Sequence, residues 1–355
     1  MPASWLYGAG VAVRNKLYDM GWLKSRSFDL PVISVGNITV GGTGKTPHIE
    51  YLASLLGQFF RVAVLSRGYR RHSSGFVLAD SGKDYLEVGD EPCQISRKFP
   101  DAVVAVDEDR CHGIDTIVSD MSVPPVDVVL LDDAYQHRAV RPGRNILLVD
   151  YNRLLCDDCL LPAGRLREPE KGKDRANIVI ITKCPQDINP MQMRLVRKKM
   201  DLYPYQKLFF TTMRYGKLYP ITLEGLRYNL ASVNPGVGVL LVTGIARPEP
   251  LEAEIGRYCD NLVTMRFPDH HEYVSDDIDG ILSRFDSLPQ GGRMIITTEK
   301  DAVRLAVRDD IPQEVKKLIY VLPIEVEFIE NKQYFNDKII EYVRNNQKNS
   351  GIFTR

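Results

Sequence analysis

The chain has 355 residues, and 46 acidic residues balance 46 basic ones, for a formal net charge of +0 at pH 7. This length favours about two domains. The balanced charge excludes a field that would recruit nucleic acid. No apolar run approaches the roughly 18 residues of a spanning helix, so we expect a protein that stays inside the cell.

The N-terminal segment is amphipathic, and we expect it to form a helix within residues 1–30. Both tryptophans of the chain, Trp5 and Trp22, lie here, with basic residues such as Arg14 and Lys16 between them. Aromatic ends with a basic, amphipathic middle are typical of a helix at a membrane interface. A helix that packs its apolar face on the following domain fits the pattern equally well.

A glycine-rich segment follows a short β-branched run, Val32–Val35, and precedes an apolar-periodic helix. This order is typical of a phosphate-binding loop, in which backbone amides surround the phosphates, a lysine reaches the β and γ oxygens and a hydroxyl ligates Mg²⁺. Thr39 stands where the usual pattern has a glycine. The residues predicted to bind the nucleotide are Gly41, Gly42, Thr43, Gly44, Lys45 and Thr46.

Short apolar strands alternate with helical segments along the whole chain, which predicts an α/β architecture. Several strands are apolar throughout, as parallel strands covered on both faces are. The predicted strands are 31–36, 61–66, 102–107, 126–132, 145–150 and 177–182 in the first half, and 237–243, 261–266, 293–297 and 319–324 in the second.

Two carboxylates, Asp132 and Asp133, end the strand at 126–132. An aspartate at the carboxyl end of a strand beside a phosphate loop holds Mg²⁺ in such proteins. Gln136 would lie at the same rim. The adjacent acids Asp90 and Glu91 are interpreted either as residues of a helix start or as a metal ligand and a general base.

Two basic loops follow strands, where ligands of open α/β sheets bind. Arg67, Tyr69 and Arg70 lie in one, and Arg165 and Arg167 in the other. Arginines in such positions suit an anionic group other than the nucleotide, although a solvated basic loop explains the first one as well.

The motifs SVGNITVGGTGKTP, SRGYRR, VGDEP, VLLDDAYQHR, LPAGRLREP, VTGIARP, FPDHHEY and TTEKDAVRL occur in this order. Together they closely resemble the tetraacyldisaccharide 4′-kinase family of lipid A biosynthesis, over nearly the full chain. Ala134 stands where the family motif usually has glycine.

The resemblance implies a fold of two α/β/α sandwich domains, the first a P-loop NTPase-like core, joined by a short β linker, with the active site between them. It implies a membrane-associating helix over 1–30, a kinase domain over 31–205 and an extended linker over 206–225. A smaller α/β domain would cover 226–330, and a C-terminal helix and tail 331–355.

The resemblance also implies that ATP phosphorylates the 4′-hydroxyl of a lipid A disaccharide 1-phosphate precursor. The catalytic pair would be Asp90 and His270, with Lys45 on the transferred phosphate; whether His270 or His271 faces the site stays open. Mg²⁺ would be held by Thr46, Glu91, Asp132 and Asp133. The acceptor would be bound by Arg67, Tyr69, Arg70, Gln136, Arg165 and Arg167.

The implied protein is a monomer bound peripherally at the cytoplasmic face of the inner membrane. Three alternatives remain. One is a GTP-driven switch, because Thr182-Lys183 and Thr298–Asp301 loosely resemble a guanine-reading motif without its asparagine. The second is a P-loop ligase or kinase with another acceptor, and the third is an inactive membrane scaffold.

Overall fold

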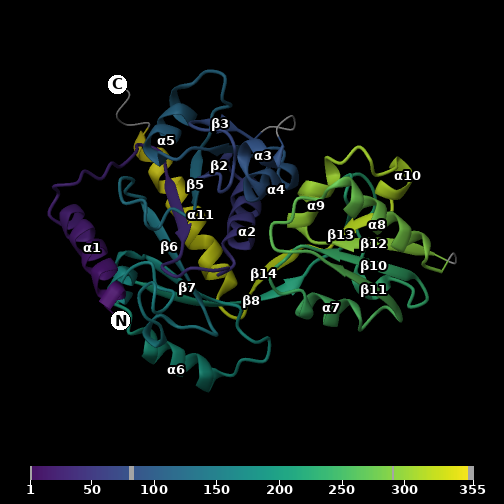
Figure 1. Ribbon diagram of the computed structural model, residues 1–355. Helices are drawn as coiled ribbons and strands as arrows, with labels where there is room; N and C mark the ends of the chain where they lie inside the picture. The colour runs from purple at the N-terminus through teal and green to yellow at the C-terminus, as the bar shows by residue number, and fades with distance from the viewer. Residues whose placement is uncertain (1, 80–83, 290–291, 351–355) are drawn as a thin grey trace. The chain divides into compact units, whose positions relative to one another are not determined.

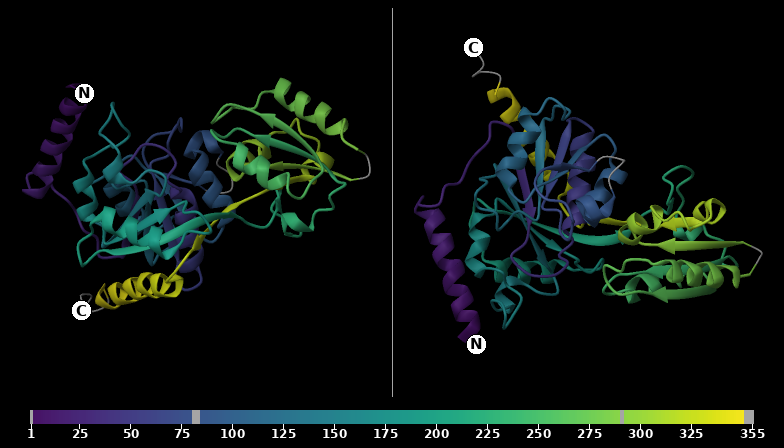
Figure 2. Two further views of the ribbon diagram at one scale, coloured as in Figure 1. Left: turned by 90° about the horizontal axis from the view of Figure 1, so that it is seen from below. Right: turned by 45° about the horizontal axis from the view of Figure 1, so that its top comes forward.

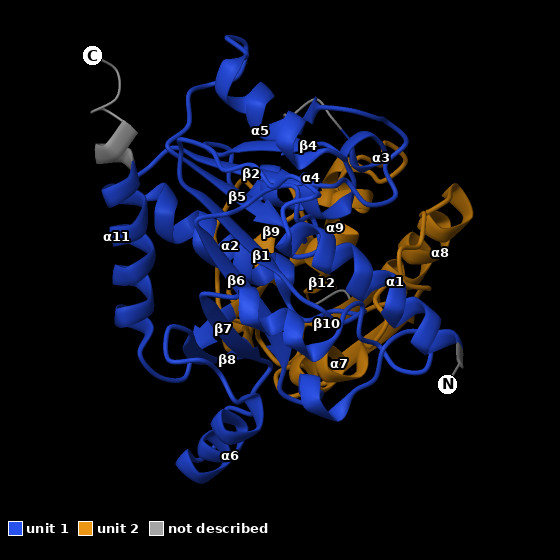
Figure 3. Cartoon of the chain, turned by 90° about the vertical axis from the view of Figure 1, so that its left-hand side faces the viewer, with its two compact units in different colours: residues 1–213, 326–355 blue, residues 214–325 orange. Residues whose placement is uncertain are grey.

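A computed structural model of the chain describes residues 2–79, 84–289 and 292–350. The chain divides into two compact units, coloured separately in Figure 3. Unit 1 consists of residues 1–213 and 326–355, and unit 2 of residues 214–325. Unit 2 is therefore an insertion within the sequence of unit 1. The predicted tail beyond residue 350 lies outside the described residues.

Unit 1 contains a nine-stranded sheet in the described part of the chain, in the order β14-β8-β7-β6-β1-β5-β2-β4-β3 (Figure 1). Every strand pair from β8 to β4 in this order is parallel, whereas β3 pairs with β4 in the antiparallel sense. The strands are β1 (Val32–Gly36), β2 (Val62–Ser66), β3 (Val77–Leu78), β4 (Val103–Val106), β5 (Val128–Asp132), β6 (Arg144–Asp150), β7 (Ile178–Thr182), β8 (Lys207–Tyr215) and β14 (Ile324–Phe328).

Both faces of this sheet are covered. The strands β1, β2, β5 and β7 are accordingly buried at every position. Ile114 and Ile117 of α5 pack with Val32, Leu65 and Leu131 of the strands. The helices of unit 1 are α1 (Pro2–Asp19), α2 (Lys45–Gly57), α3 (Tyr85–Val88), α4 (Asp90–Lys98), α5 (Arg110–Ser119), α6 (Pro190–Met200) and α11 (Lys332–Ser350).

The C-terminal helix α11 returns to unit 1 after the chain has built unit 2 (Figures 1 and 2). The ring of Phe335 lies 5.2 Å from that of Phe209 on β8, and Tyr51 of α2 donates a hydrogen bond of 2.7 Å to Asn336. The hydroxyl of Tyr342 donates to the carbonyl of Val32 on β1 at 3.3 Å. These contacts attach α11 to the sheet and to α2.

Unit 2 is built on a smaller sheet, five-stranded within the described residues, with the order β11-β10-β12-β13-β9. Its first four strands are parallel, and β9 is antiparallel to β13. The strands are β9 (Tyr219–Pro220), β10 (Gly238–Thr243), β11 (Asn261–Arg266), β12 (Arg293–Thr297) and β13 (Ile319–Val321). The helices are α7 (Glu249–Ile255), α8 (Ser275–Asp286), α9 (Glu299–Ala306) and α10 (Gln313–Lys316).

The architecture confirms the predicted α/β fold with parallel sheets. All ten strands predicted from the sequence are present within a few residues of their expected bounds. Continuous β-branched and aliphatic runs predict such strands well, because both faces of a parallel strand are buried.

The N-terminal helix α1 lies along one side of unit 1 (Figure 2). The hydroxyl of Tyr7 donates to the carbonyl of Arg167 at 2.8 Å, and Asn15 donates to Glu168 at 3.3 Å. In contrast, Trp5 is 76% exposed, and Trp22, just beyond the helix, is 77% exposed. The helix therefore makes polar contacts with the rest of unit 1, whereas Trp5 on the helix and Trp22 beyond it are exposed to solvent. None of the helices in the described ranges has the length and apolar character needed to cross a bilayer.

Candidate active site

The glycine-rich loop runs from the end of β1 to the start of α2. Gly41 has a φ of 107° and Gly44, the residue before the helix, a φ of 84°. The positive φ favours glycine at position 44, because residues with a Cβ atom rarely adopt this conformation. The helix N-terminus directs free amides and a partial positive charge at the loop, which suits a phosphate.

Thr39, at the position where the usual motif has glycine, is paired with the basic loop at 160–167. Thr39 and Leu166 form an antiparallel bridge, the amide of Val40 donates to the carbonyl of Arg165 at 2.8 Å, and the amide of Arg167 donates to the carbonyl of Ile38 at 2.7 Å. This part of the loop therefore has an extended backbone, which any residue adopts, and the glycine is not needed.

The two carboxylates at the end of β5, Asp132 and Asp133, have different surroundings. Asp133 has a φ of 47° and lies 3.3 Å from Nζ of Lys45 and 3.3 Å from the Arg167 guanidinium. Asp132 is 5% exposed; its Oδ2 accepts a hydrogen bond from Ser66 at 3.3 Å, whereas Oδ1 has no partner among the described residues.

Burial raises the pKa of Asp132 to about 6, and the negative charges of Asp133 and Glu91 contribute, while Lys45 and Arg110 oppose the rise. The net effect of these surroundings disfavours the ionised form of Asp132, which an added cation beside its unpartnered oxygen would favour. The donor set is the one that Mg²⁺ prefers, since carboxylate and hydroxyl oxygens are hard ligands.

Asp90 and Glu91 form the first turn of α4. Gly89 precedes them with a φ of 95°, and a Cβ atom there would lie 3.1 Å from the carbonyl of Tyr69. The loop of Tyr69 and the start of α4 therefore touch. Asp90 is buried and Glu91 half-buried. Both acids thus lie at a helix start, as one of the two interpretations expected.

The residues predicted to bind the acceptor are spread over three loops of unit 1. Arg67, Tyr69, Arg70 and Arg165 are exposed. Gln136 is engaged within the protein, because its side-chain amide donates to the carbonyl of Asn37 at 2.8 Å and to Glu168 at 2.9 Å.

His270 belongs to unit 2, in the loop after β11. It has a φ of 63°, and its carbonyl accepts a hydrogen bond of 2.7 Å from Arg304. The neighbouring His271 lies 2.8 Å from Asp277 through Nε2, and its ring stacks on Phe267 at 4.9 Å. His271 is thus held by contacts of its own unit.

Several side chains around the loop were missed by the sequence analysis. Asn37, directly after β1, is fully buried and donates to the hydroxyl of Thr43 at 2.8 Å. Thr182 and Lys183, at the end of β7, contact the loop backbone. Their positions at the carboxyl ends of predicted strands could have indicated them, because the carboxyl ends of neighbouring parallel strands meet at one edge of the sheet.

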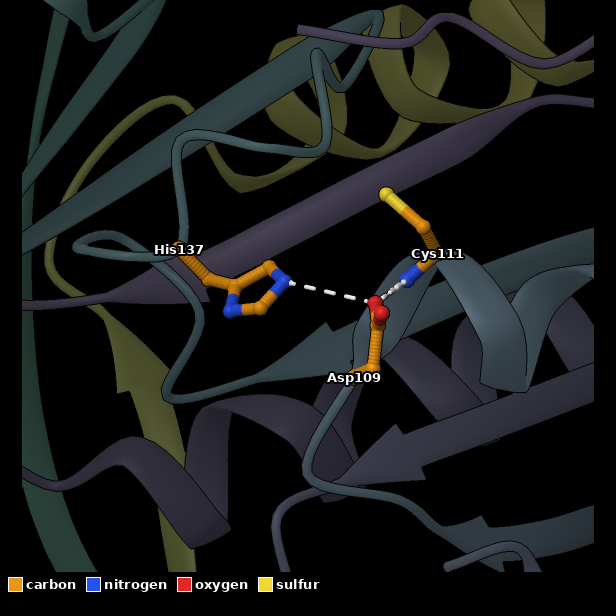
Figure 4. A group of neighbouring side chains, drawn as sticks. All are labelled: Asp109, Cys111 and His137. Atoms are coloured by element: carbon orange, nitrogen blue, oxygen red, sulfur yellow. Dashed lines mark hydrogen bonds and ion pairs between the residues drawn. The ribbon is translucent and has the colours of Figure 1, made fainter. Parts of the chain in front are cut away.

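A second cluster, Asp109, Cys111 and His137, lies at the start of α5 (Figure 4). Asp109 accepts a hydrogen bond from the amide of Cys111 at 2.8 Å and lies 4.0 Å from Nε2 of His137. Burial and the charge of Arg110 lower the pKa of His137. Asp109 caps the helix through this hydrogen bond, which accounts for the position of its carboxylate in the cluster.

Comparison with known proteins gives a consistent result. The profile of a family described as tetraacyldisaccharide-1-P 4′-kinase (LpxK) matches residues 1–344. A tetraacyldisaccharide 4′-kinase of Phocaeicola vulgatus is 55% identical over 352 residues, covering 99% of this chain and 96% of that protein. One from Bacteroides fragilis is 52% identical, covering 99% and 94%.

A solved structure also resembles the whole chain. It is the crystal structure of the "apo" form of LpxK from Aquifex aeolicus in complex with ATP, with a TM-score of 0.75 and 30% sequence identity. The alignment covers 96% of this chain and 97% of that one.

Proposed function

Because the chain belongs to the tetraacyldisaccharide-1-P 4′-kinase family, we propose that it transfers the γ-phosphate of ATP to the 4′-hydroxyl of a tetraacylated glucosamine disaccharide 1-phosphate, a lipid A precursor. The observation that carries this proposal is the family match over residues 1–344, which includes the loop, both carboxylate pairs and the histidine pair. The related kinase in complex with ATP supports ATP as the donor.

The phosphate loop is proposed to bind the β and γ phosphates of ATP through the residues Gly41 to Thr46. Lys45 is half-buried and lies 3.3 Å from Asp133, so its ammonium group is oriented before the nucleotide arrives. Charge on the transferring phosphoryl group is spread over its oxygens, and catalysis is mainly positioning and electrostatic stabilisation. Lys45 would neutralise part of that charge.

Thr46, Glu91, Asp132 and Asp133 are proposed to hold Mg²⁺. The residues fit the ion, because Asp132 has a buried oxygen without a partner and a pKa raised by burial and by the neighbouring acids. When bound, Mg²⁺ would neutralise these carboxylates and the phosphate oxygens. The protein's own part is to keep Asp132 desolvated and aimed, with Ser66 donating to its other oxygen.

Asp90 is proposed as the general base that accepts the proton of the 4′-hydroxyl. It is 5% exposed and lies in the first turn of α4, next to Glu91. His270 of unit 2 is proposed to assist Asp90, on the family motif alone. The adjacent Glu91 is proposed as a ligand of Mg²⁺ and not as the base.

The acceptor is proposed to bind through Arg67, Tyr69, Arg70, Arg165 and Arg167. Guanidinium groups suit its 1-phosphate, since they form bidentate hydrogen bonds to phosphate oxygens. Arg167 is already engaged with Asp133 at 3.3 Å, so it would join the acceptor side of the site to the carboxylates. Gln136 is proposed to contribute through the backbone that it fixes at Asn37.

Membrane contact is proposed for the N-terminal helix, at the cytoplasmic face of the inner membrane and as a monomer. The exposed tryptophans support this, because large aromatic side chains gain free energy at the bilayer interface. Tyr7 and Asn15 hold the helix against Arg167 and Glu168, so the proposed membrane surface and the acceptor loop are joined by hydrogen bonds.

The test is transfer of label from γ-labelled ATP to a tetraacylated glucosamine disaccharide 1-phosphate in detergent. Wild-type protein should label the lipid, and Lys45→Ala should not. Hydrolysis of ATP without labelled lipid would indicate another acceptor, and a preference for GTP would support the switch alternative.

A further inference from the structure

Three consecutive carbonyl groups of the phosphate loop each accept a hydrogen bond from a side chain. Nζ of Lys183 donates to the carbonyl of Gly42, and the hydroxyl of Thr182 donates to that of Thr43 at 2.9 Å. Nδ1 of His48 lies 2.7 Å from the carbonyl of Gly44. His48 was not predicted to act in the site, and Thr182 and Lys183 appeared only in the guanine-reading alternative.

The donors are themselves fixed. Thr182 is the last residue of β7 and is fully buried, with a weaker contact of 3.4 Å from its hydroxyl to the carbonyl of Val149. Lys183 follows it with a φ of 56° and forms an ion pair of 3.0 Å with Asp150 at the end of β6. The loop is thereby tied to two neighbouring strands of the sheet.

His48 is held from both sides of its ring. It is 3% exposed, in the first turn of α2, and its Nε2 lies 3.2 Å from the hydroxyl of Thr211 on β8. A carbonyl oxygen only accepts, so Nδ1 carries the proton and Nε2 is left as an acceptor facing the Thr211 hydroxyl, which also lies 3.4 Å from the carbonyl of Ile181.

Fixing a carbonyl also fixes the amide on the other side of the same peptide bond. The peptide unit is planar and trans, so its C=O and N–H groups point in opposite directions. The carbonyls of Gly42, Thr43 and Gly44 belong to the same peptides as the amides of Thr43, Gly44 and Lys45. Among the described residues, none accepts a hydrogen bond from these three amides.

We propose that Thr182, Lys183 and His48 are positioning residues for the phosphates of ATP. By binding the three carbonyls they hold three successive amides in the orientation that receives phosphate oxygens. The loop then does not reorganise when the nucleotide binds, which favours affinity. The inference rests on the proposed function only in taking the anion to be ATP. It also gives the Thr182-Lys183 pair a role other than reading guanine.

The sharpest test replaces Thr182 by valine, which keeps the shape of the buried side chain and removes its hydroxyl. The carbonyl of Thr43 then has no donor and the peptide is free to rotate. We expect the dissociation constant of Mg²⁺-ATP and the KM for ATP to rise about tenfold, with the KM for the lipid acceptor unchanged. Thr182→Ser, which restores the hydroxyl, should stay within about twofold of wild type.

Thr297 provides a matched control in unit 2. It is also fully buried at the end of a strand, β12, and its hydroxyl donates to the carbonyl of Val242 at 2.9 Å. Thr297→Val should lower the melting temperature as Thr182→Val does but leave the affinity for ATP unchanged. Equal losses of ATP affinity in the two variants would overturn the proposal, because the effect would then follow from stability.

Lys183→Met keeps the proposal testable if Thr182→Val does not fold. The Lys183 side chain is 38% exposed, so its replacement should be tolerated, and exposed Lys171→Met is the control. Affinity is measured by titrating a fluorescent ATP analogue with Mg²⁺ and no acceptor. A wild-type affinity in Lys183→Met would overturn the proposal. Because binding is measured without lipid, a failure to phosphorylate the lipid acceptor would count against the proposed function alone.

Discussion

Replacing Asp132 by asparagine should stabilise the magnesium-free protein at neutral pH. Asparagine keeps the shape of the side chain and removes its charge. Burial raises the pKa of Asp132 from 3.8 to about 6. Each pKa unit corresponds to about 1.4 kcal/mol, so ionising this carboxyl in the folded protein costs about 3 kcal/mol more than in the unfolded chain.

The sign follows from the direction of the shift. A carboxyl whose pKa is higher in the folded state destabilises the native protein when it is ionised. This destabilisation is absent below about pH 3.8, where the carboxyl is protonated in both states, and complete above about pH 6. We expect Asp132→Asn to increase the free energy of unfolding by about 1–3 kcal/mol at pH 7.5. At about pH 4 the variant and the wild type should be nearly equal.

The assay is urea denaturation followed by circular dichroism in the presence of EDTA, at several pH values. Asp127, at the other end of the same strand segment, is the control: its hydrogen bonds with Arg61 lower its pKa, so Asp127→Asn should reduce stability at neutral pH. If Asp132→Asn were less stable than wild type at pH 7.5, the Asp132 carboxylate would have stabilising partners in the magnesium-free protein. The argument that it lacks a compensating cation and therefore suits a metal would then fail.

Four further outcomes are expected. Asp90→Asn should lower turnover at saturating substrates about a thousandfold while changing ATP affinity by less than about twofold; near-wild-type turnover would remove Asp90 as the base. Adding His270→Ala to that variant should lower turnover little further, because a residue that assists the base acts only through the base. If the losses in turnover of the two single variants add up in the double variant, the two residues have independent roles. The affinity for Mg²⁺ should fall about tenfold per pH unit below about pH 6, as protons compete at Asp132; a flat titration would contradict this ligand. Replacing Trp5 and Trp22 together by serine should reduce co-sedimentation with anionic vesicles at an unchanged melting temperature, whereas unchanged binding would favour a helix that only packs on the protein.

The phosphate loop and its carboxylates could be predicted because they follow local rules. A β-branched strand before the glycines of the loop, and a strand ending in Asp132 and Asp133, each occupy a short window of sequence. The same holds for the start of α4. Gly89, the residue before the helix, has a positive φ, and glycine adopts this conformation readily.

The contacts that support the loop could not be predicted, because they depend on the register between strands. Thr182 reaches the carbonyl of Thr43, although the two residues are separated by 139 positions. Read locally, Thr182-Lys183 resembled part of a guanine-binding motif. The hydrogen bonds of the Gln136 amide to Asn37 and Glu168 likewise join residues far apart in the sequence, and its proposed contribution to acceptor binding stays a prediction.

The interrupted sequence of unit 1 has a consequence for synthesis of the protein. Unit 2, residues 214–325, is continuous, so all of its core residues are available once residue 325 has left the ribosome. Unit 1 cannot complete its core until α11 follows, because Phe335 and Ile339 are almost fully buried in it and Tyr342 bonds to β1. During translation the aromatic side chains of Tyr51 and Phe209 thus remain uncovered for more than a hundred codons. Nascent chains stalled before residue 326 should accordingly be bound by chaperones far more than finished ones.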